Sequence, residues 1–73
     1  MMLNNSEKYI VRVDNEYLVA HPYFGSTFAR FIISPYDGYP FEDFTVAYIF
    51  AHMFGGSVMK HNRATGKIEG GWK

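Results

Sequence analysis

Residues 41–54 most limit what this chain can fold into, because they are apolar on almost every side of a helix. The polar positions in this segment are Glu42, Asp43, Thr45 and His52. The two acidic residues suit the first turn of a helix, and Gly55 and Gly56 form a strong stop signal, so a helix with a body of residues 44–54 is predicted. A helix that covers one sheet needs an apolar stripe only about 100° wide. We therefore expect loops of the chain, a second copy or a different protein to cover the remaining apolar surface of the helix.

The chain is too short to bury a large core around such a helix. It has 73 residues and no cysteine, so it has no disulfide to stabilise it. At this length one core rarely supplies more than roughly 3–5 kcal/mol, and self-association is a common remedy. We expect one domain over residues 1–73, with residues 1–7 and 69–73 flexible.

Composition excludes several classes of protein. The chain is 48% hydrophobic and 19% aromatic with zero formal net charge, which argues against disorder. No run reaches the roughly 18 apolar residues of a membrane span, so no membrane partner is expected. The absence of cysteine fits a reducing compartment, and we expect the protein in the cytoplasm, of the host cell if a phage encodes it.

Strand-like segments flank the predicted helix. Residues 9–13 and 16–20 predict a hairpin around Asp14 and Asn15, with Tyr9, Val11 and Val13 on one face. Residues 28–33 predict a third strand and residues 57–61 a fourth, followed by a turn at 62–67 and a short return strand from 68. The expected fold is α+β, with a small antiparallel sheet in the order β-β-β-α-β and one helix packed across it; the short return strand is an optional extension of this sheet.

Motifs of catalysis and metal binding are missing. Ser26, Ser34 and Ser57 lie in or beside predicted turns, none in a Gly-x-Ser-x-Gly elbow, and no glycine-rich loop opens a helix. The spacing of His21, His52 and His61 matches no zinc signature. We therefore expect no enzyme, no cofactor and no metal site.

Three groups of residues are candidate binding surfaces. An aromatic surface for a partner protein is predicted from Tyr23, Phe24, Tyr36, Asp37, Tyr39 and Phe41. The equally weighted alternative is that these rings roof the helix and complete the core. A self-association surface on the helix is predicted from Tyr48, Ile49, His52 and Met53.

A basic hairpin is the candidate nucleic-acid surface, formed by Lys60, His61, Arg63 and Lys67. Residues 57–73 carry four basic residues and one acidic residue, whereas residues 1–56 carry three basic and six acidic residues. This asymmetry suits a charged partner or head-to-tail contact between copies. Overall neutrality argues against a protein that neutralises several phosphates, and solvated charges are the simpler interpretation.

In length, aromatic content, lack of cysteine and order of elements, the chain resembles short accessory proteins of phages and prophages of Gram-positive bacteria. Residues 9–13 and the helix end at 47–56 carry the likeness. Some of those proteins are anti-defence inhibitors, including anti-CRISPR proteins, so the resemblance implies binding to a host protein without catalysis. The likeness is one of outline, and it assigns a role to no residue here. Many anti-CRISPR proteins are strongly acidic, whereas this chain is neutral.

The sequence thus predicts a non-catalytic protein-binding module whose partner is a host protein or a second copy. A small nucleic-acid-binding protein is the first alternative. A ligand-binding protein or small enzyme is the second, and it predicts a pocket lined by tyrosines with His52 or His61 at its wall.

Overall fold

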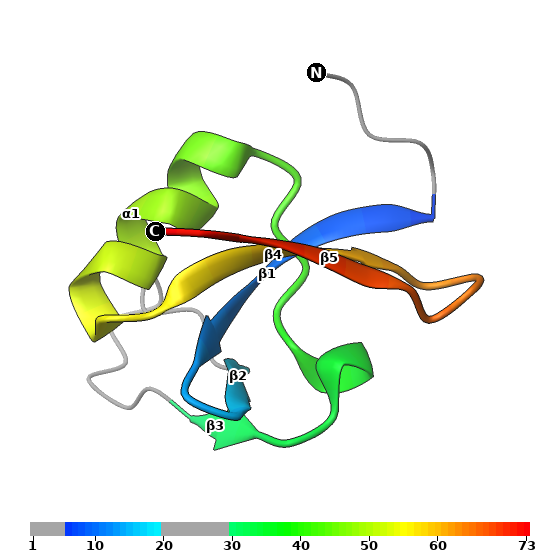
Figure 1. The fold of residues 1–73 in the computed structure, drawn as a ribbon, viewed down its shortest axis with the longest axis horizontal. Helices are drawn as coiled ribbons and strands as arrows, with labels where there is room; N and C mark the ends of the chain where they lie inside the picture. The colour runs from blue at the N-terminus through cyan, green and yellow to red at the C-terminus, as the bar shows by residue number, and fades with distance from the viewer. Residues whose placement is uncertain (1–5, 20–29) are drawn as a thin grey trace.

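The structure is a computed structural model that describes residues 6–19 and 30–73. Within these ranges it has five strands, one α-helix and a short 3-10 helix: β1 (Glu7–Val13), β2 (Glu16–Leu18), β3 (Phe31–Ile32), η2 (Pro35–Asp37), α1 (Phe44–Phe54), β4 (Ser57–Asn62) and β5 (Ile68–Trp72). The strands form one antiparallel sheet in the order β3-β2-β1-β4-β5. Figure 1 shows α1 and η2 on opposite sides of β1. The predicted α+β fold is confirmed, including the additional C-terminal strand.

The predicted first hairpin forms, with a turn at Asp14, whose φ of 56° lies in the left-handed region that Asp tolerates. Strands β2 and β3 are shorter than predicted. Part of the predicted second and third strands, 16–20 and 28–33, lies outside the described residues. Strand β2 covers only the C-terminal end of β1. Further along β1, the chain segment before α1 pairs with it instead, because Tyr9 and Phe41 exchange two backbone hydrogen bonds of 2.8 Å.

The helix has the predicted body but begins later than its acidic residues suggested. Asp43 is the N-cap, and its carboxylate accepts a 2.8 Å hydrogen bond from the Thr45 backbone N–H. The expectation that Glu42 and Asp43 lie within the first turn is therefore wrong, because both residues precede it. At the other end Gly55 adopts a φ of 71° and closes the helix.

Gly56 allows the chain to leave α1 in contact with β1. A Cβ at this position would lie 2.2 Å from the Arg12 carbonyl oxygen, so only glycine fits there. The two predicted stop glycines thus have different roles, one in ending the helix and one in bringing β4 next to β1.

Each face of the sheet has its own hydrophobic cluster. On the α1 side the buried residues are Tyr9, Val11, Leu18, Phe41, Ala47, Phe50, Ala51 and Val58, with Val13 packed against them. The predicted shared face of Tyr9, Val11 and Val13 is therefore confirmed. On the other side Ile10, Tyr17 and Met59 form a smaller cluster, with Ile68 against it.

Strand β5 brings the C-terminal segment alongside α1 (Figure 1). Most of residues 69–73, for which the sequence suggested flexibility, lie in this strand. The Tyr48 hydroxyl donates a 3.0 Å hydrogen bond to the Lys73 carbonyl oxygen. Across the described part of the chain, no helix combines the length and apolar character needed to cross a membrane.

Candidate functional site: a groove at the N-terminal end of α1

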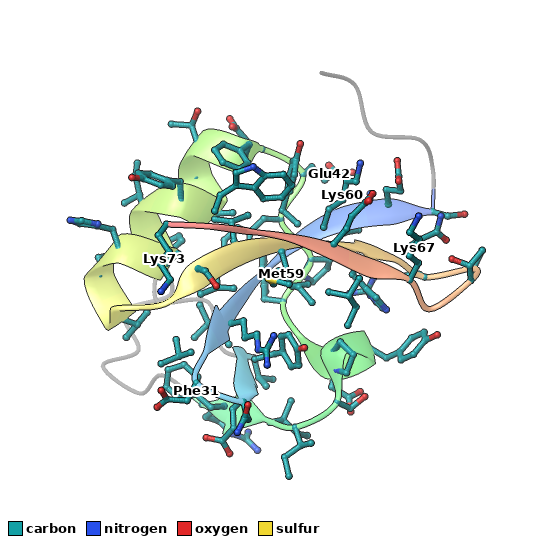
Figure 2. The ribbon with its side chains drawn as sticks, viewed as in Figure 1. Phe31, Glu42, Met59, Lys60, Lys67 and Lys73 are labelled. Carbon is teal, nitrogen blue, oxygen red and sulfur yellow. The ribbon has the colours of Figure 1, made fainter. Side chains whose placement is uncertain are left out.

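A groove of about 810 Å³ opens where the N-terminal end of α1 meets strands β4 and β5. Its lining consists of Tyr9, Glu42, Asp43, Phe44, Thr45, Lys60, Glu69, Gly70 and Trp72. Residues from the beginning, middle and end of the chain therefore meet here. In Figure 2, Glu42 and Lys60 lie close together above the strands.

The register of the strands explains why these side chains meet. Tyr9 pairs with Lys60 across β1 and β4, and Lys60 pairs with Glu69 across β4 and β5. Residues directly opposite in antiparallel strands point to the same face of a sheet. Tyr9 belongs to the cluster on the α1 side, so all three side chains lie on that face. Because α1 begins only at Phe44, this end of the face stays open.

Aromatic rings form the apolar wall of the groove. Trp72 meets Phe44 edge to face with 5.6 Å between ring centroids, and Phe44 meets Tyr9 in the same manner at 5.3 Å. Trp72 packs back onto the domain through these contacts, yet 43% of this residue remains exposed. The residue therefore forms a partly exposed section of the groove wall.

Gly70 provides the space for the Trp72 indole. A Cβ at position 70 would lie 2.2 Å from the indole Cζ3, and the φ of Gly70 is 110°, which L side chains rarely adopt. This glycine lets the indole lie against the backbone of its own strand.

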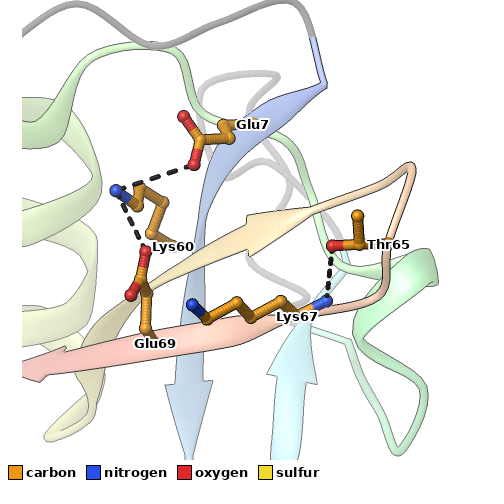
Figure 3. Close-up of polar contacts among 5 residues, drawn as sticks. All are labelled: Glu7, Lys60, Thr65, Lys67 and Glu69. Carbon is orange, nitrogen blue, oxygen red and sulfur yellow. Dashed lines mark hydrogen bonds and ion pairs between the residues drawn. The ribbon is translucent and has the colours of Figure 1, made fainter.

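Ion pairs form the polar wall of the groove (Figure 3). The Lys60 Nζ lies 3.1 Å from Glu69 Oε1 and 3.7 Å from Glu7 Oε2. The hydrogen bond to Glu69 is the main reason why the pKa of Lys60 is raised above its ordinary value. Lys60 is therefore a cation engaged by two carboxylates.

Glu42 extends the polar wall at the mouth of the groove. Its Oε1 lies 2.6 Å from the Lys8 Nζ, and 78% of its side chain is exposed. The hydrogen bond from Lys8, followed by the charge of Lys8, lowers the pKa of Glu42. Glu42 is therefore ionised at neutral pH and open to solvent.

A second surface lies on the outer side of α1. Ile49 is 52% exposed, Met53 62% and Tyr48 37%, and the exposed His52 stacks on Tyr48 with 6.2 Å between ring centroids. The structure therefore brings together all four residues of the predicted self-association surface. From Phe44 to Phe54 the helix has no Asp, Glu, Lys or Arg.

The predicted aromatic surface is divided by the fold. Phe41 is buried, with 3% exposure, and Tyr39 packs against the same core, so for these two the alternative core interpretation is correct. Tyr36 and Asp37 are exposed in η2, on the other side of the sheet. Tyr23 and Phe24 lie outside the described residues.

The predicted basic hairpin does not present a row of cations. Lys60 is engaged by Glu7 and Glu69. The Arg63 guanidinium donates to the carbonyl oxygens of Tyr36 at 3.3 Å and Gly38 at 3.1 Å, holding η2 against β4. Lys67 is exposed. Lys60 and Arg63 are therefore engaged in contacts within the fold, whereas Lys67 faces solvent.

His61, the fourth member of that group, is fully buried. Its ring meets Tyr36 edge to face at 4.6 Å, and neither ring nitrogen has a hydrogen-bond partner among residues 6–19 and 30–73. Burial, and secondly the nearby charge of Arg63, lower the pKa of His61 below its ordinary value of 6.5. It is a neutral core residue in this fold.

The groove differs from the pocket that the ligand-binding alternative predicts. Among the described residues, Tyr9 is the one tyrosine that lines it, and neither His52 nor His61 does so. Within residues 6–19 and 30–73, no group of three or more His, Cys, Asp or Glu side chains could hold a metal ion.

Sequence reasoning missed the groove because its residues are distant in sequence. Trp72, Glu69 and Phe44 were not among the candidate residues, and Lys60 was interpreted as a nucleic-acid contact. The available signal was the hairpin around residues 62–67, which places Glu69 opposite Lys60 once its register is known.

Comparison of the chain with models of protein families, with curated proteins and with solved structures found no match. The site is therefore interpreted from its own geometry.

Proposed function

We propose that this protein is a non-catalytic binding module that acts through the outer face of α1, and that a second copy of the chain occupies this face. The observation that carries the proposal is an exposed helix face without a charged side chain, formed by Tyr48, Ile49, His52 and Met53. Exposed helix faces in monomers normally carry charged residues, whereas the centres of protein interfaces are depleted of them.

The spacing of this face supports helix-against-helix contact. Its residues follow an i, i+1, i+4, i+5 pattern, which forms one continuous ridge along a helix. A two-fold pair would place this ridge against its own copy, as in most small homodimers. The face is short, since a helix of 11 residues is about 16 Å long, so we expect a weak dimer with a dissociation constant on the order of micromolar.

The biological role we propose follows the resemblance stated above. The protein acts as an accessory or inhibitor protein of a phage or mobile element, in the cytoplasm, by binding a host protein. Phage genes beside its gene would support this role, and a metabolic operon would count against it.

Analytical ultracentrifugation from micromolar to millimolar concentration tests the dimer. We expect a reversible monomer–dimer equilibrium that Ile49→Lys shifts fully to monomer. Ile33→Lys is the matched control, because Ile33 is 75% exposed and belongs to the loop after β3 rather than to α1. A monomer at every concentration, or equal dissociation by both variants, contradicts the proposal.

A further inference from the structure

We propose that the groove at the N-terminal end of α1 binds a lysine or arginine side chain presented by a basic segment of a partner protein. This inference goes beyond the proposed function, since it concerns a different surface and does not require the dimer. It rests on three properties of the groove: a partly exposed tryptophan, an excess of carboxylates and a fixed geometry.

The aromatic face is provided by Trp72. Its indole is held by edge-to-face contact with Phe44 and lies against Gly70, yet 43% of the residue remains exposed. Tryptophan is the best aromatic partner for a cation, because its ring face carries the strongest negative potential. The aliphatic stem of a lysine or arginine can pack against the same ring while its charged end reaches the polar wall.

The charges around the groove favour a cation. Glu42, Asp43 and Glu69 line it and Glu7 adjoins it through Lys60, against the ammonium groups of Lys60 and Lys8. Four carboxylates thus face two cations, which leaves an excess of two negative charges. The low pKa of Glu42 keeps this charge present at neutral and mildly acidic pH.

The same arrangement disfavours an anion, although a helix N-terminus lies at the groove. Asp43 caps this N-terminus, with its carboxylate accepting from the Thr45 N–H, so a negative group already occupies the position that a phosphate would take. Lys60 is held by two carboxylates. An incoming acidic group would therefore meet the carboxylates of the wall.

The groove is arranged before a ligand arrives. Lys60 holds Glu69 at 3.1 Å, and Lys8 holds Glu42 at 2.6 Å. Gly70 leaves room for the indole to lie against the strand. A side chain that enters the groove therefore finds its aromatic and carboxylate partners in place, which lowers the entropic cost of binding.

The single tryptophan of the sequence is Trp72, so its fluorescence reports on the groove directly. The probe is the tetrapeptide acetyl-Gly-Arg-Lys-Gly-amide, compared with its neutral analogue containing citrulline and norleucine. We expect saturable quenching or a wavelength shift with the basic peptide only, weakened by added salt. Equal binding of the neutral analogue, binding of an acidic peptide instead, or no response at millimolar peptide would overturn the proposal.

Variants locate the binding site. Peptide binding to each variant is followed by NMR chemical shifts, because a Trp72 variant lacks the fluorescent reporter. We expect Glu42→Gln to weaken peptide binding about threefold to tenfold and Trp72→Leu to abolish it, while Trp72→Phe retains part of it. Asp37→Asn, which removes an exposed carboxylate in η2, is the matched control. An Asp37→Asn effect as large as that of Glu42→Gln rejects this site.

The test also separates this inference from the proposed dimer. Ile49→Lys leaves every lining residue in place and is expected to bind the peptide as the wild type does. Wild-type peptide affinity in a chain that never dimerises would reject the dimer and retain the groove. A dimer that does not bind the peptide would retain the dimer and reject the groove.

Discussion

The two faces of the sheet are closed by different means. On one face α1 lays Ala47, Phe50 and Ala51 over the strands, and the buried cluster there is formed by hydrophobic side chains. The other face is closed by the short η2 and Gly38. It encloses His61, and neither ring nitrogen of His61 has a hydrogen-bond partner in the described part of the chain. Buried apolar surface is therefore abundant on the α1 side of the sheet and scarce on the η2 side. The contribution of the first face to the free energy of unfolding should be insensitive to pH, whereas the contribution of the second face should depend on pH.

The largest expected effect comes from breaking the helix-covered face. Phe50 is 4% exposed, and Phe50→Ala should cost about 3–5 kcal/mol, which is enough to unfold a domain of this size. Circular dichroism of the variant checks this. Phe50→Leu keeps the chain folded enough for a urea titration. Met53→Ala on the outer side of the same helix is the control, and a similar loss there would contradict the assignment of the core.

Changing His61 should give the next largest effect and tests the other face. In the folded state the pKa of His61 lies below its ordinary value of 6.5, so the unfolded chain binds more protons as the pH falls through that value. The free energy of unfolding should therefore fall as the pH drops below about 6.5 and rise again on return to neutral pH. Urea titrations between pH 5 and 8 measure this slope.

His61→Leu should remove most of this pH dependence. It should also raise stability at neutral pH by about 1 kcal/mol, because it removes buried polar atoms that lack partners. His52→Gln, at an exposed position on α1, should leave the slope unchanged. An unchanged slope in His61→Leu would show that another group sets the pH dependence.

The cap of α1 allows a finer test of the helix-covered face. Asp43→Ala should cost about 1 kcal/mol, since the Thr45 N–H loses its side-chain acceptor. Thermal unfolding followed by circular dichroism measures the loss. Asp43→Asn retains an acceptor oxygen and should stay near wild type. Equal losses in both variants would indicate that charge, rather than capping, is what matters at this position.

The smallest effect is expected from the surface ion pair between Lys8 and Glu42. Lys8→Gln should not change the unfolding midpoint measurably, because exposed ion pairs contribute little. It should raise the pKa of Glu42 towards its ordinary value of 4.5, as an NMR titration of the carboxyl carbon would show. A clear loss of stability would mean that this pair supports one of the faces.

Local signals made the elements of the fold predictable. Gly55 and Gly56 mark the end of α1, the alternation of Tyr9, Val11 and Val13 identifies the helix-covered face, and the Asp14 turn sets the first hairpin. The grouping of exposed residues on the outer side of α1 was also predictable, because α1 has more apolar residues than one sheet can cover. These features depend on residues a few positions apart.

Features that depend on pairing between distant strands were not predictable. The position of Lys60 between Glu7 and Glu69 requires the registers of both neighbouring strands. His61 occurs in a basic stretch of sequence and looks like a surface residue, yet it lies on the face that η2 closes. For the same reason Phe41 looked like an exposed loop ring, although its backbone pairs with Tyr9 and turns it into the core.

The backbone of β5 has a consequence for how copies of this protein can meet. Strand β5 is an edge of the sheet, where unpaired amides could recruit a strand from another molecule. Gly70 and Gly71 have φ values of 110° and 102°, and the pairing with β4 shifts between Val58 and Met59. This irregular border lacks the even row of donors and acceptors that fibril growth requires, so crowding should not drive these molecules into amyloid-like stacks from this side.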